Sequence, residues 1–351
     1  MKQPIVPFFI SHRGCPHKCV FCDQVKIAGA GGEFPSGTEI LAKIASYRDS
    51  GRCRSVEVAF YGGTFTALSP AVQEGLLQPL QPLVASGEVG SIRVSTRPDA
   101  IDLQTVRFLR EMGVKTVELG VQSMADDVLD LAGRGHTSAD VVRAGRMLRE
   151  AGLALGAQLM PGLPGDTSEK AMDSLARVIA LQPDFIRIYP TLVIAGTKLA
   201  DFYEIGSYRP LSIETAVLIC KAMLHRAWKA AIPVIRMGLQ PTVELETAGT
   251  ILAGPYHPAF RHLVEAELCF DLLHRMTSGM CRGSSVEISC APSRISAVIG
   301  HKRGNVARLE QIYGLTVKKV RGDPALSPFE FSVERGGDRL HGDMIRDLEY
   351  G

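Results

Sequence analysis

RGCPHKCVFCD, residues 13–23, is the most informative stretch of this chain because it places Cys15, Cys19 and Cys22 in the spacing C-x3-C-x2-C. Cysteine thiolates hold iron–sulfur clusters, and four of them close the coordination of a 4Fe–4S cluster. Three thiolates leave one iron open, and an open metal position can take a small molecule and act on it. The spacing therefore predicts a cluster that carries out chemistry.

Two other interpretations of these cysteines stay open. One is a zinc site with His12 or His17 as the fourth ligand, and the other is a loop whose cysteines bind nothing. Structural zinc sites usually have two ligand pairs separated by a longer spacer, and the sequence holds no second pair. The remaining cysteines stand singly and are predicted to be buried thiols: Cys53, Cys220, Cys269, Cys281 and Cys290.

Composition indicates a reducing, cytoplasmic setting. Eight cysteines in 351 residues are too few for a disulfide scaffold, and the opening Met-Lys-Gln-Pro lacks the apolar core of a signal peptide. No apolar stretch approaches the roughly 20 residues that a membrane-spanning helix needs. With 46% hydrophobic residues the chain can bury a sizeable core, and its length predicts a large domain with a smaller one.

Charge is unevenly distributed along the chain, although the net charge is only +2. Residues 282–321 carry eight Lys or Arg against two Glu, an excess of six positive charges, so the remainder carries −4. A basic terminal segment is typical of proteins that bind polyanions, whereas a merely solvated surface is the alternative. The basic residues are Arg282, Arg294, Lys302, Arg303, Arg308, Lys318, Lys319 and Arg321.

Apolar, β-rich runs alternate with longer amphipathic stretches, which predicts βα units and a parallel sheet. The predicted strands are Pro4–Ile10, Ser55–Phe60, Ser91–Ser95, Thr116–Gln122, Ala154–Met160, Phe185–Tyr189 and Val234–Gly238. The predicted helices are Glu39–Asp49, Ala71–Ala85, Leu103–Met112, Ser138–Ala151, Glu169–Leu181 and Ile213–Lys229. We expect an α/β fold, a partial (β/α)6 barrel that is an incomplete version of the (β/α)8 barrel of triosephosphate isomerase.

Polar and glycine-rich motifs follow the predicted strands, at the ends where parallel barrels carry their chemistry. The cysteine loop follows the first strand and Gly62-Gly63-Thr64 the second. Later strands are followed by Thr96-Arg97-Pro98-Asp99, Gln122-Ser123 and Met160-Pro161-Gly162-Leu163-Pro164. Glycines let backbone groups approach a charged ligand closely, so Gly62-Gly63-Thr64 is either a binding turn or a plain strand-to-helix turn.

The cysteine spacing, with Phe21 just before the third cysteine, resembles the signature of radical S-adenosylmethionine (SAM) enzymes. In that family the open iron chelates the amine and carboxylate of SAM, and an electron from the cluster cleaves the sulfonium. The resulting 5′-deoxyadenosyl radical abstracts hydrogen from the substrate. The resemblance implies that Gly62-Gly63-Thr64 holds the methionine amine, and that a reductant such as flavodoxin or ferredoxin is a partner.

Six ordered motifs resemble the radical SAM domain of the Elongator catalytic subunit, from the first strand to about residue 240. They are FYGGTFTAL (60–68), STRPD (95–99), ELGVQS (118–123), RGHT (134–137), MPGLP (160–164) and IYPTLVIAGT (188–197). The resemblance implies a cytoplasmic enzyme that modifies C5 of the wobble uridine of tRNA. The Elongator subunit differs in having a wider gap between its first two cysteines and a long C-terminal acetyltransferase domain. The tight spacing of this chain looks more like the coproporphyrinogen dehydrogenase branch.

The resemblance also implies roles for single residues. Phe21 is expected to pack against the adenine, and Gln122 and Arg134 to lie near the ribose and the carboxylate of SAM. Ser95 falls where relatives often have Glu, and Gln158 falls where the dehydrogenase branch has Asp. Gln122 as a satisfied strand-end amide, and Arg134 as a cation at a helix end, are the structural alternatives.

Tyr189, at the end of the sixth predicted strand, is expected either to face the substrate cavity or to be a core tyrosine with a hydrogen-bonded hydroxyl. The predicted boundaries are a barrel over residues 1–240, a helical linker packing on it over 241–284, and a basic module over 285–351. The linker contains the predicted helix Leu263–Met276, preceded by a polar patch of His257, Pro258 and Arg261.

The terminal module resembles a KH domain, whose glycine loop clamps the backbone of single-stranded nucleic acid. The predicted elements are the strand Ser285–Cys290, the helices Arg294–Ile299 and Asn305–Tyr313, and the strand Leu315–Val320. A basic loop, Gly300-His301-Lys302-Arg303-Gly304, joins the helices, with three residues between its glycines where KH domains have two. The resemblance implies that Gly300, Lys302, Arg303 and Gly304 contact nucleic acid, whereas a module that only packs on the barrel is the alternative.

Three classes of function therefore remain. The first is a radical SAM enzyme that acts on tRNA, and the second is a radical SAM enzyme that acts on a small molecule such as a tetrapyrrole. The third is a non-enzymatic iron–sulfur protein that carries electrons or binds RNA. SAM binding separates the third class from the others, and an RNA affinity that falls steeply with salt separates the first from the second.

Overall fold

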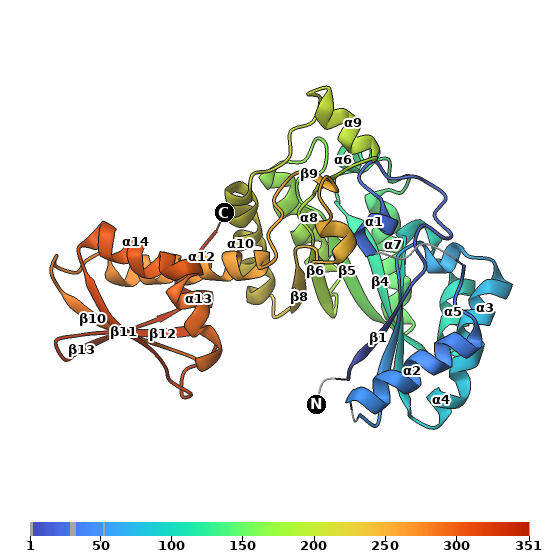
Figure 1. Ribbon diagram of the computed structural model, residues 1–351, viewed down its shortest axis with the longest axis horizontal. Helices are drawn as coiled ribbons and strands as arrows, with labels where there is room; N and C mark the ends of the chain where they lie inside the picture. Colours follow the sequence, from blue (N-terminus) through green and yellow to red (C-terminus); the bar gives the residue numbers. More distant parts are fainter. Residues whose placement is uncertain (1–2, 29–32, 52, 351) are drawn as a thin grey trace. The chain divides into compact units, whose positions relative to one another are not determined.

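A computed structural model describes residues 3–28, 33–51 and 53–350 of the chain (Figure 1). The chain forms two compact units. The first comprises residues 1–211 and 239–255, and the second comprises residues 212–238 and 256–351.

The first unit is built on parallel strands that pair in the order of the sequence, from β1 to β6. These strands are β1 (Ile5–Phe9), β2 (Val56–Tyr61), β3 (Val89–Thr96), β4 (Val114–Gln122), β5 (Ala154–Leu159) and β6 (Phe185–Ile188). The α/β class and the parallel arrangement expected from the sequence are confirmed, because near-continuous apolar runs form strands that are buried on both faces.

The helices of this unit include those that connect the successive parallel strands, as a parallel sheet requires, and two, α9 and α11, that come after β6. They are α1 (Gln24–Ala28), α2 (Gly37–Gly51), α3 (Pro70–Leu77), α4 (Gln81–Ala85), α5 (Leu103–Glu111), α6 (Asp126–Leu131), α7 (Ser138–Glu150), α8 (Ser168–Ala180), α9 (Lys198–Glu204) and α11 (Val243–Glu246). A two-stranded antiparallel ribbon pairs β7 (Val193–Ile194) with β9 (Ile251–Ala253). The helix predicted over 71–85 is wrong as a single element: it is α3, a 3-10 turn and α4, because prolines at 79 and 82 lack the backbone N–H that a continuous helix needs.

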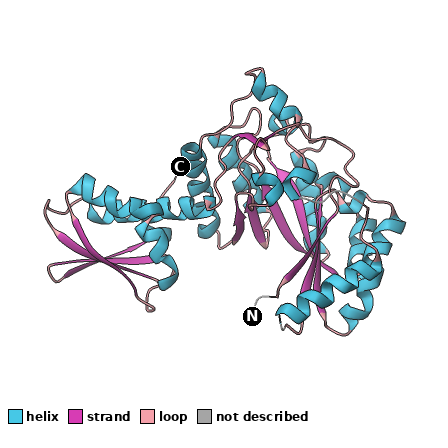
Figure 2. Ribbon diagram, viewed as in Figure 1, coloured by secondary structure: helices cyan, strands magenta, loops and turns pink. Residues whose placement is uncertain are grey.

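The two faces of the parallel sheet differ in what covers them. Phe8 lies on the face covered by helices, where the Lys43 ammonium of α2 lies over its ring. Successive side chains of a strand point to opposite faces, so Phe9 lies on the other face, which we call the inner face. Figure 2 shows helices packed along one side of these strands.

The second unit contains α10 (Ile213–Lys229), β8 (Val234–Met237) and α12 (Phe260–Thr277), followed by a four-stranded sheet. The sheet has the order β11-β10-β12-β13, with β10 parallel to β11 and the other pairs antiparallel. Its elements are β10 (Ser285–Cys290), α13 (Ile295–Ile299), α14 (Gly304–Tyr313), β11 (Thr316–Gly322), β12 (Glu330–Arg335), β13 (Asp338–Asp343) and α15 (Met344–Asp347). The predicted succession of strand, helix, loop, helix and strand is present, and β12, β13 and α15 were not anticipated.

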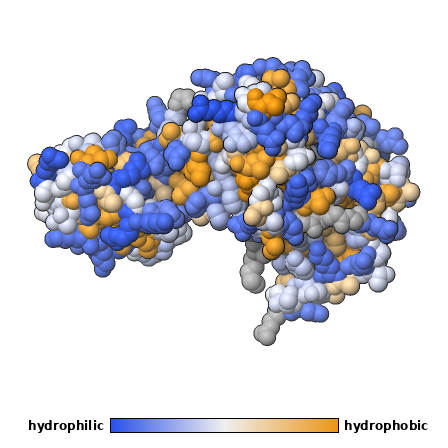
Figure 3. All heavy atoms as spheres, turned by 45° about the horizontal axis from the view of Figure 1, so that its top comes forward, coloured by the Kyte–Doolittle hydropathy of each residue, from blue (hydrophilic) through white to orange (hydrophobic). Residues whose placement is uncertain are grey.

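The contact-defined units do not coincide with the predicted boundaries at residues 240 and 284. The reason is that α12, which was expected to be a linker helix, packs against α10, α13 and α14 inside the second unit. In the part of the chain that the structure describes, no helix is long and apolar enough to cross a membrane. On the face drawn in Figure 3, hydrophobic residues form scattered patches among hydrophilic ones.

The cysteine loop, the glycine turn and their surroundings

The cysteine loop after β1 and the Gly62-Gly63-Thr64 turn after β2 are in direct contact. The Thr64 backbone N–H donates to the Arg13 carbonyl at 2.8 Å, and the Thr64 hydroxyl lies 3.3 Å from the Cys15 sulfur. Gly63 has φ +60, and a Cβ at this position would lie 2.3 Å from the Arg13 carbonyl oxygen and 2.5 Å from that of Ile10. Glycine is therefore required at position 63 for the turn to pack against the cysteine loop.

Gln24, on the first turn of α1, ties these two segments together. Its side-chain oxygen accepts hydrogen bonds from the backbone N–H groups of Gly63, at 2.8 Å, and of His12. In return the Gln24 backbone N–H donates to Nε2 of His12 at 2.8 Å. Nothing in the sequence marked Gln24 as special, because a glutamine after a loop carries no pattern until its partners are known.

The three cysteines differ in their surroundings. Cys19 is buried, and Nη1 of Arg134 lies 3.1 Å from its sulfur, a position in which a cation stabilises a thiolate. Burial raises the pKa of Cys15, with the Thr64 hydrogen bond acting against it. Burial, followed by the charges of Cys19 and Cys15, raises the pKa of Cys22 to about 12. The charges of Cys19 and Cys15 both disfavour a thiolate at Cys22, an effect that a bound cationic iron centre would oppose.

The two histidines considered as a fourth zinc ligand are engaged elsewhere. Nε2 of His12 accepts the hydrogen bond from Gln24, and the ring of His17 lies against Gly135. Among residues 3–28, 33–51 and 53–350, no three or more His, Cys, Asp or Glu side chains are grouped so that they could hold a metal ion, and this includes the side chains of Cys15, Cys19 and Cys22 as they stand here.

Arg134 and Gln122, which lie far apart from the cysteines in sequence, are brought to the same place. Nη2 of Arg134 donates to the Gly120 carbonyl at 2.7 Å, and the side chains of Gln122 and Gln158 are hydrogen-bonded at 3.1 Å. A Cβ at Gly120 would lie 2.9 Å from the Gln122 amide and 3.2 Å from the Arg134 guanidinium, so glycine makes room for both. Ser95 is the register partner of Glu118 on the inner face and is half-buried.

Phe21 is buried in an apolar cluster that also contains Val128, Leu163, Leu199 and Tyr208. This cluster fixes the segment between the second and third cysteines, because Cys19 and Val20 belong to it as well. The Leu199 backbone N–H donates to the Val20 carbonyl at 2.8 Å. The expected contact of Phe21 with an adenine stays a prediction.

Two further polar residues near Arg134 were missed by the sequence analysis. Arg97 is 3% exposed and forms a two-point ion pair with Asp99, at 2.9 and 2.8 Å. His136 is 2% exposed, and burial together with the cations of Arg134 and Arg97 lowers its pKa to about 3. Both residues stand in quoted motifs, STRPD and RGHT, which is the signal that could have found them.

A chain of buried ion pairs crosses the inner face. Arg93 donates to Glu57 at 2.8 Å and to Glu118 at 2.7 Å, and Arg187 donates to Glu118 at 2.9 Å. The four residues come from β2, β3, β4 and β6, and the pairing register places them on one face. Tyr189, one residue beyond β6, accepts a hydrogen bond from Nη1 of Arg187 at 3.2 Å. This buried network holds as many cations as anions.

The basic loop of the second unit has a fixed backbone with exposed cations. Gly300 (φ +80) leaves no space for a Cβ beside Asn305, whose amide donates to the carbonyls of Ala297 and Ala266 at 3.0 and 2.7 Å. Lys302 and Arg303 are exposed and both adopt positive φ, +49 and +63, as ordinary residues rarely do. Gly304 begins α14.

Fewer positive charges of residues 282–321 are free to bind a polyanion than the sequence count indicates, because several of them form ion pairs. Arg294 pairs with Glu265 at 2.9 Å, Arg308 with Glu267 at 2.7 Å and Arg321 with Glu287 at 2.8 Å. The glutamates at 265 and 267 lie on α12, outside the counted segment, so the sequence count could not include them. The exposed cations that remain without an ion pair in the described chain are Arg282, Lys302, Arg303, Lys318 and Lys319.

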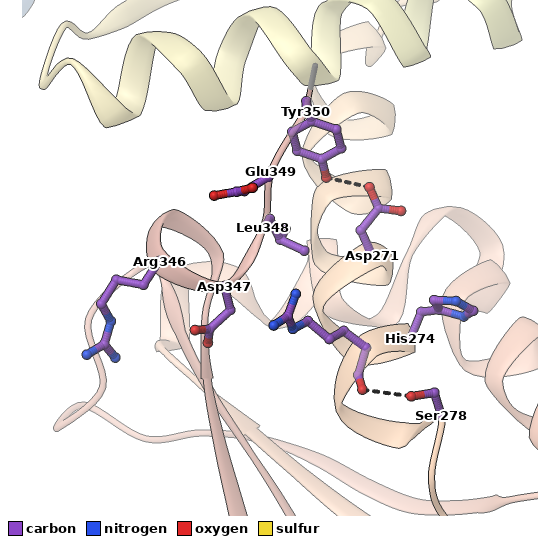
Figure 4. Close-up of a pocket in the computed structure, with 9 residues that line it drawn as sticks. Asp271, His274, Ser278, Arg346, Asp347, Leu348, Glu349 and Tyr350 are labelled. Carbon is purple, nitrogen blue, oxygen red and sulfur yellow. Dashed lines mark hydrogen bonds between the residues drawn. The ribbon is translucent and has the colours of Figure 1, made fainter.

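A pocket of about 710 Å³ lies in the second unit, between α12 and the segment that follows β13 (Figure 4). Asp271 on its wall accepts hydrogen bonds from the Tyr350 hydroxyl and, at 2.6 Å, from the Lys221 ammonium. None of the residues singled out from the sequence lines it. Its walls are formed by Asp271, His274, Arg275, Ser278, Arg346, Asp347, Leu348, Glu349 and Tyr350.

Two family models match consecutive parts of the chain. Residues 9–178 match the Radical SAM superfamily, and residues 183–269 match the Radical_SAM C-terminal domain. The chain belongs to the Radical SAM superfamily. The three-cysteine loop, the glycine turn and the strands β2 to β5 lie within the first of these matches, and β6 lies within the second.

Known proteins resemble the radical SAM part of the chain. A tRNA uridine(34) acetyltransferase of Methanocaldococcus jannaschii is 26% identical over 255 residues, which cover 61% of this chain and 47% of the relative. Elongator complex protein 3 of Danio rerio is 29% identical over 178 residues, which cover 45% of this chain and 32% of the relative. The solved structure of Methanocaldococcus infernus Elp3 with an N-terminal deletion has a TM-score of 0.61 and 22% identity. That match covers 80% of this chain and 64% of the other, and it shows the shared fold. The matched part of the chain thus spans about half the length, or less, of these curated relatives.

Proposed function

We propose that this radical SAM enzyme holds a 4Fe–4S cluster on Cys15, Cys19 and Cys22, cleaves SAM reductively, and acts on a uridine of tRNA. The observation that supports it best is the contact of the cysteine loop with the Gly62-Gly63-Thr64 turn and with Arg134. Three segments that lie apart in the sequence meet at the carboxyl ends of strands, where a parallel barrel carries its chemistry.

The donor chemistry fits such a cluster and its cosubstrate, because three thiols share one loop and the Arg134 cation lies beside the Cys19 sulfur. A bound cluster would supply the electron that breaks SAM into methionine and a 5′-deoxyadenosyl radical. Arg134, held by the Gly120 carbonyl, keeps a cation beside the Cys19 sulfur. Buried Arg134 also carries an Nε atom without a hydrogen-bond partner in the described chain, as expected of a group that meets an anion such as a carboxylate.

Further residues of the chain would surround SAM. The Gly62-Gly63-Thr64 turn offers backbone groups to the methionine amine, and Gln24 holds this turn against the cysteine loop. Gln122 and Gln158 share a hydrogen bond next to Arg134, where they could contact the ribose and the carboxylate. We assign Ser95 to the same inner-face surface and Phe21 to the adenine.

The substrate is proposed from the relatives. The tRNA uridine(34) acetyltransferase matches over the radical SAM part of this chain, and the order of the six motifs is the same as in the Elongator subunit. We therefore propose a wobble uridine as the modified nucleoside and a flavodoxin or ferredoxin as the reductant. The loop with Gly300, Lys302, Arg303 and Gly304 would hold the RNA backbone, because its two exposed cations have no ion pair in the described chain.

The test begins with anaerobic reconstitution of the full chain with iron and sulfide. We expect about four irons and four sulfides per chain, and little of either in Cys15→Ala, Cys19→Ala or Cys22→Ala, because each change removes one of three anchors. Cys53→Ala is the matched control. The reduced enzyme should release 5′-deoxyadenosine and methionine from SAM, and nucleosides of tRNA from a host that lacks the gene should lack one modified uridine.

A different experimental result would contradict each part of the proposal. Zinc without sulfide in anaerobic preparations would contradict the cluster. A full cluster without 5′-deoxyadenosine would contradict SAM cleavage. Normal tRNA nucleosides in the gene-deleted host, together with SAM cleavage that a small molecule rather than tRNA stimulates, would favour a small-molecule substrate.

A further inference from the structure

Two aromatic rings stand at the carboxyl ends of β1 and β2 on the inner face. Phe9 and Tyr61 are register partners, and their ring centroids lie 6.0 Å apart. Phe9 is 41% exposed, although it precedes the cysteine loop by only a few residues and the alternate positions Val6 and Phe8 are buried. An exposed aromatic ring beside a catalytic loop is a surface on which a flat ring can stack.

The Tyr61 hydroxyl accepts a hydrogen bond from Arg187 and therefore has its own proton available to donate. Nη2 of Arg187 donates to the Tyr61 oxygen at 3.2 Å, and the guanidinium lies over the Tyr61 ring at 5.1 Å. Arginine has only donors, so Tyr61 must be the acceptor in this pair and its own proton is directed elsewhere. Burial, followed by the Glu118 charge, raises the pKa of Tyr61, which keeps the hydroxyl protonated.

The charges next to Tyr61 are already balanced. Arg187 is paired with Glu118, and Arg93 is paired with Glu118 and Glu57. A carboxylate-bearing substrate would need an unpaired cation here, because burial of a charge without a partner is costly. The surface instead fits a neutral flat ring whose edge carries a hydrogen-bond acceptor.

We propose that Phe9 and Tyr61 bind the uracil base of the substrate, with Phe9 stacking on the ring and Tyr61 donating to its 4-carbonyl. This rests on the proposed function, in which the substrate is a uridine of RNA. Cytosine has an amino group in place of that carbonyl. The amino group is a hydrogen-bond donor, as the Tyr61 hydroxyl is here, so cytosine would bind more weakly. Uracil and cytosine stack equally well, so Phe9 contributes affinity and Tyr61 contributes selectivity.

The experiment measures binding of fluorescently labelled anticodon stem-loop RNAs that differ only at position 34, U or C. The protein is the full chain, reconstituted anaerobically, and the readout is anisotropy. We expect the unmodified protein to bind the U34 RNA about threefold to tenfold more tightly, as for one neutral hydrogen bond. Tyr61→Phe should lower the affinity for the U34 RNA to that for the C34 RNA. Tyr203 is an exposed tyrosine on α9, and the control Tyr203→Phe should keep the difference in affinity between the two RNAs.

A second variant tests the stacking. Phe9→Ala should weaken both RNAs by the same factor, on the order of tenfold, because base stacking on an aromatic ring does not depend on the base. Phe9 is partly exposed, so this variant is expected to fold, and circular dichroism and the thermal unfolding midpoint check all variants.

The outcomes separate this inference from the proposed function. Equal U34 and C34 affinities in the unmodified protein, or an unchanged ratio in Tyr61→Phe, would contradict the inference while RNA remains the substrate. A protein that binds neither RNA but cleaves SAM would contradict the tRNA assignment and the base contact together.

Discussion

Gly63 shows how a single residue can serve both the fold and the proposed site. The family resemblance implies that a glycine here makes space for the methionine amine. In the structure the missing Cβ gives space to the carbonyls of Arg13 and Ile10, in the loop that carries the cysteines. A side chain at 63 would therefore push the cysteine loop away from the turn before any ligand is bound.

We predict that Gly63→Ala lowers the iron content of the reconstituted protein. The added methyl group would lie 2.3 Å from a backbone oxygen, which cannot move as a flexible side chain can. Overpacking of this kind costs about 1–3 kcal/mol, and the left-handed φ adds about 1–2 kcal/mol. The measurements are iron and sulfide content and the free energy of unfolding in denaturant.

Gly87→Ala is the matched control for this prediction. Gly87 has φ +78, so the substitution carries the same backbone strain, but no atom lies within 4 Å of the position of its Cβ. We expect it to lose stability from the strain alone and to keep its iron. Equal iron content in the two variants would mean that contact with the cysteine loop does not depend on Gly63.

Residues inside motifs could be predicted from the sequence, whereas residues brought together by strand register could not. Cys19 and Arg134, 115 positions apart, were both singled out because each stands in a short pattern, and their side chains meet at 3.1 Å. Arg93 and Glu57 each look like an isolated charge in a strand, and only the pairing of β2 with β3 shows that they form a buried ion pair.

At the scale of elements, the strands were predictable because their apolar runs are nearly continuous. The strand at Val56–Tyr61 is buried over almost its whole length, and its predicted bounds differ by one residue at each end. The first four residues of β13 are exposed, so this strand has no continuous apolar run and was not predicted. Short elements such as α9 were missed because seven residues are too few for a helical pattern.

The loop of residues 300–304 carries the prediction at this scale. We predict that Lys302→Glu with Arg303→Glu weakens tRNA binding at low salt and lowers the slope of log K against log salt. Each lost phosphate contact lowers the slope by roughly 0.7 to 0.9. Both side chains are exposed and have no ion pair in the described chain, so the fold should not depend on their charge.

Arg226→Glu with Lys229→Glu is the control for this loop. Both residues are exposed near the end of α10, and the pair makes the same change in net charge on the same unit. We expect this control to alter the slope much less than the loop variant. If the two variants have equal slopes of log K against log salt, tRNA binding depends on the total charge of the unit and not on the loop.

At the scale of the whole molecule, the two units offer RNA different kinds of interaction. The inner face of the first unit has a balanced network of ion pairs beside Phe9 and Tyr61. The second unit has the exposed cations Lys302 and Arg303. Phosphate contacts release counterions and so depend on salt, while stacking on an aromatic ring releases none.

We predict that combining Phe9→Ala with Lys302→Glu and Arg303→Glu separates the contribution of base stacking from that of phosphate contacts. Phe9→Ala should lower the affinity for the U34 stem-loop RNA by the same factor at every salt concentration, and leave the slope unchanged. The loop variant should change the slope, and in the combined variant the two losses should multiply, as for sites without shared partners. Anisotropy titrations over a range of salt measure all three proteins. A combined variant that binds the RNA no more weakly than the weaker-binding of Phe9→Ala and the loop variant would show that the RNA contacts only one of the two surfaces. The salt slope of Phe9→Ala would then identify the surface.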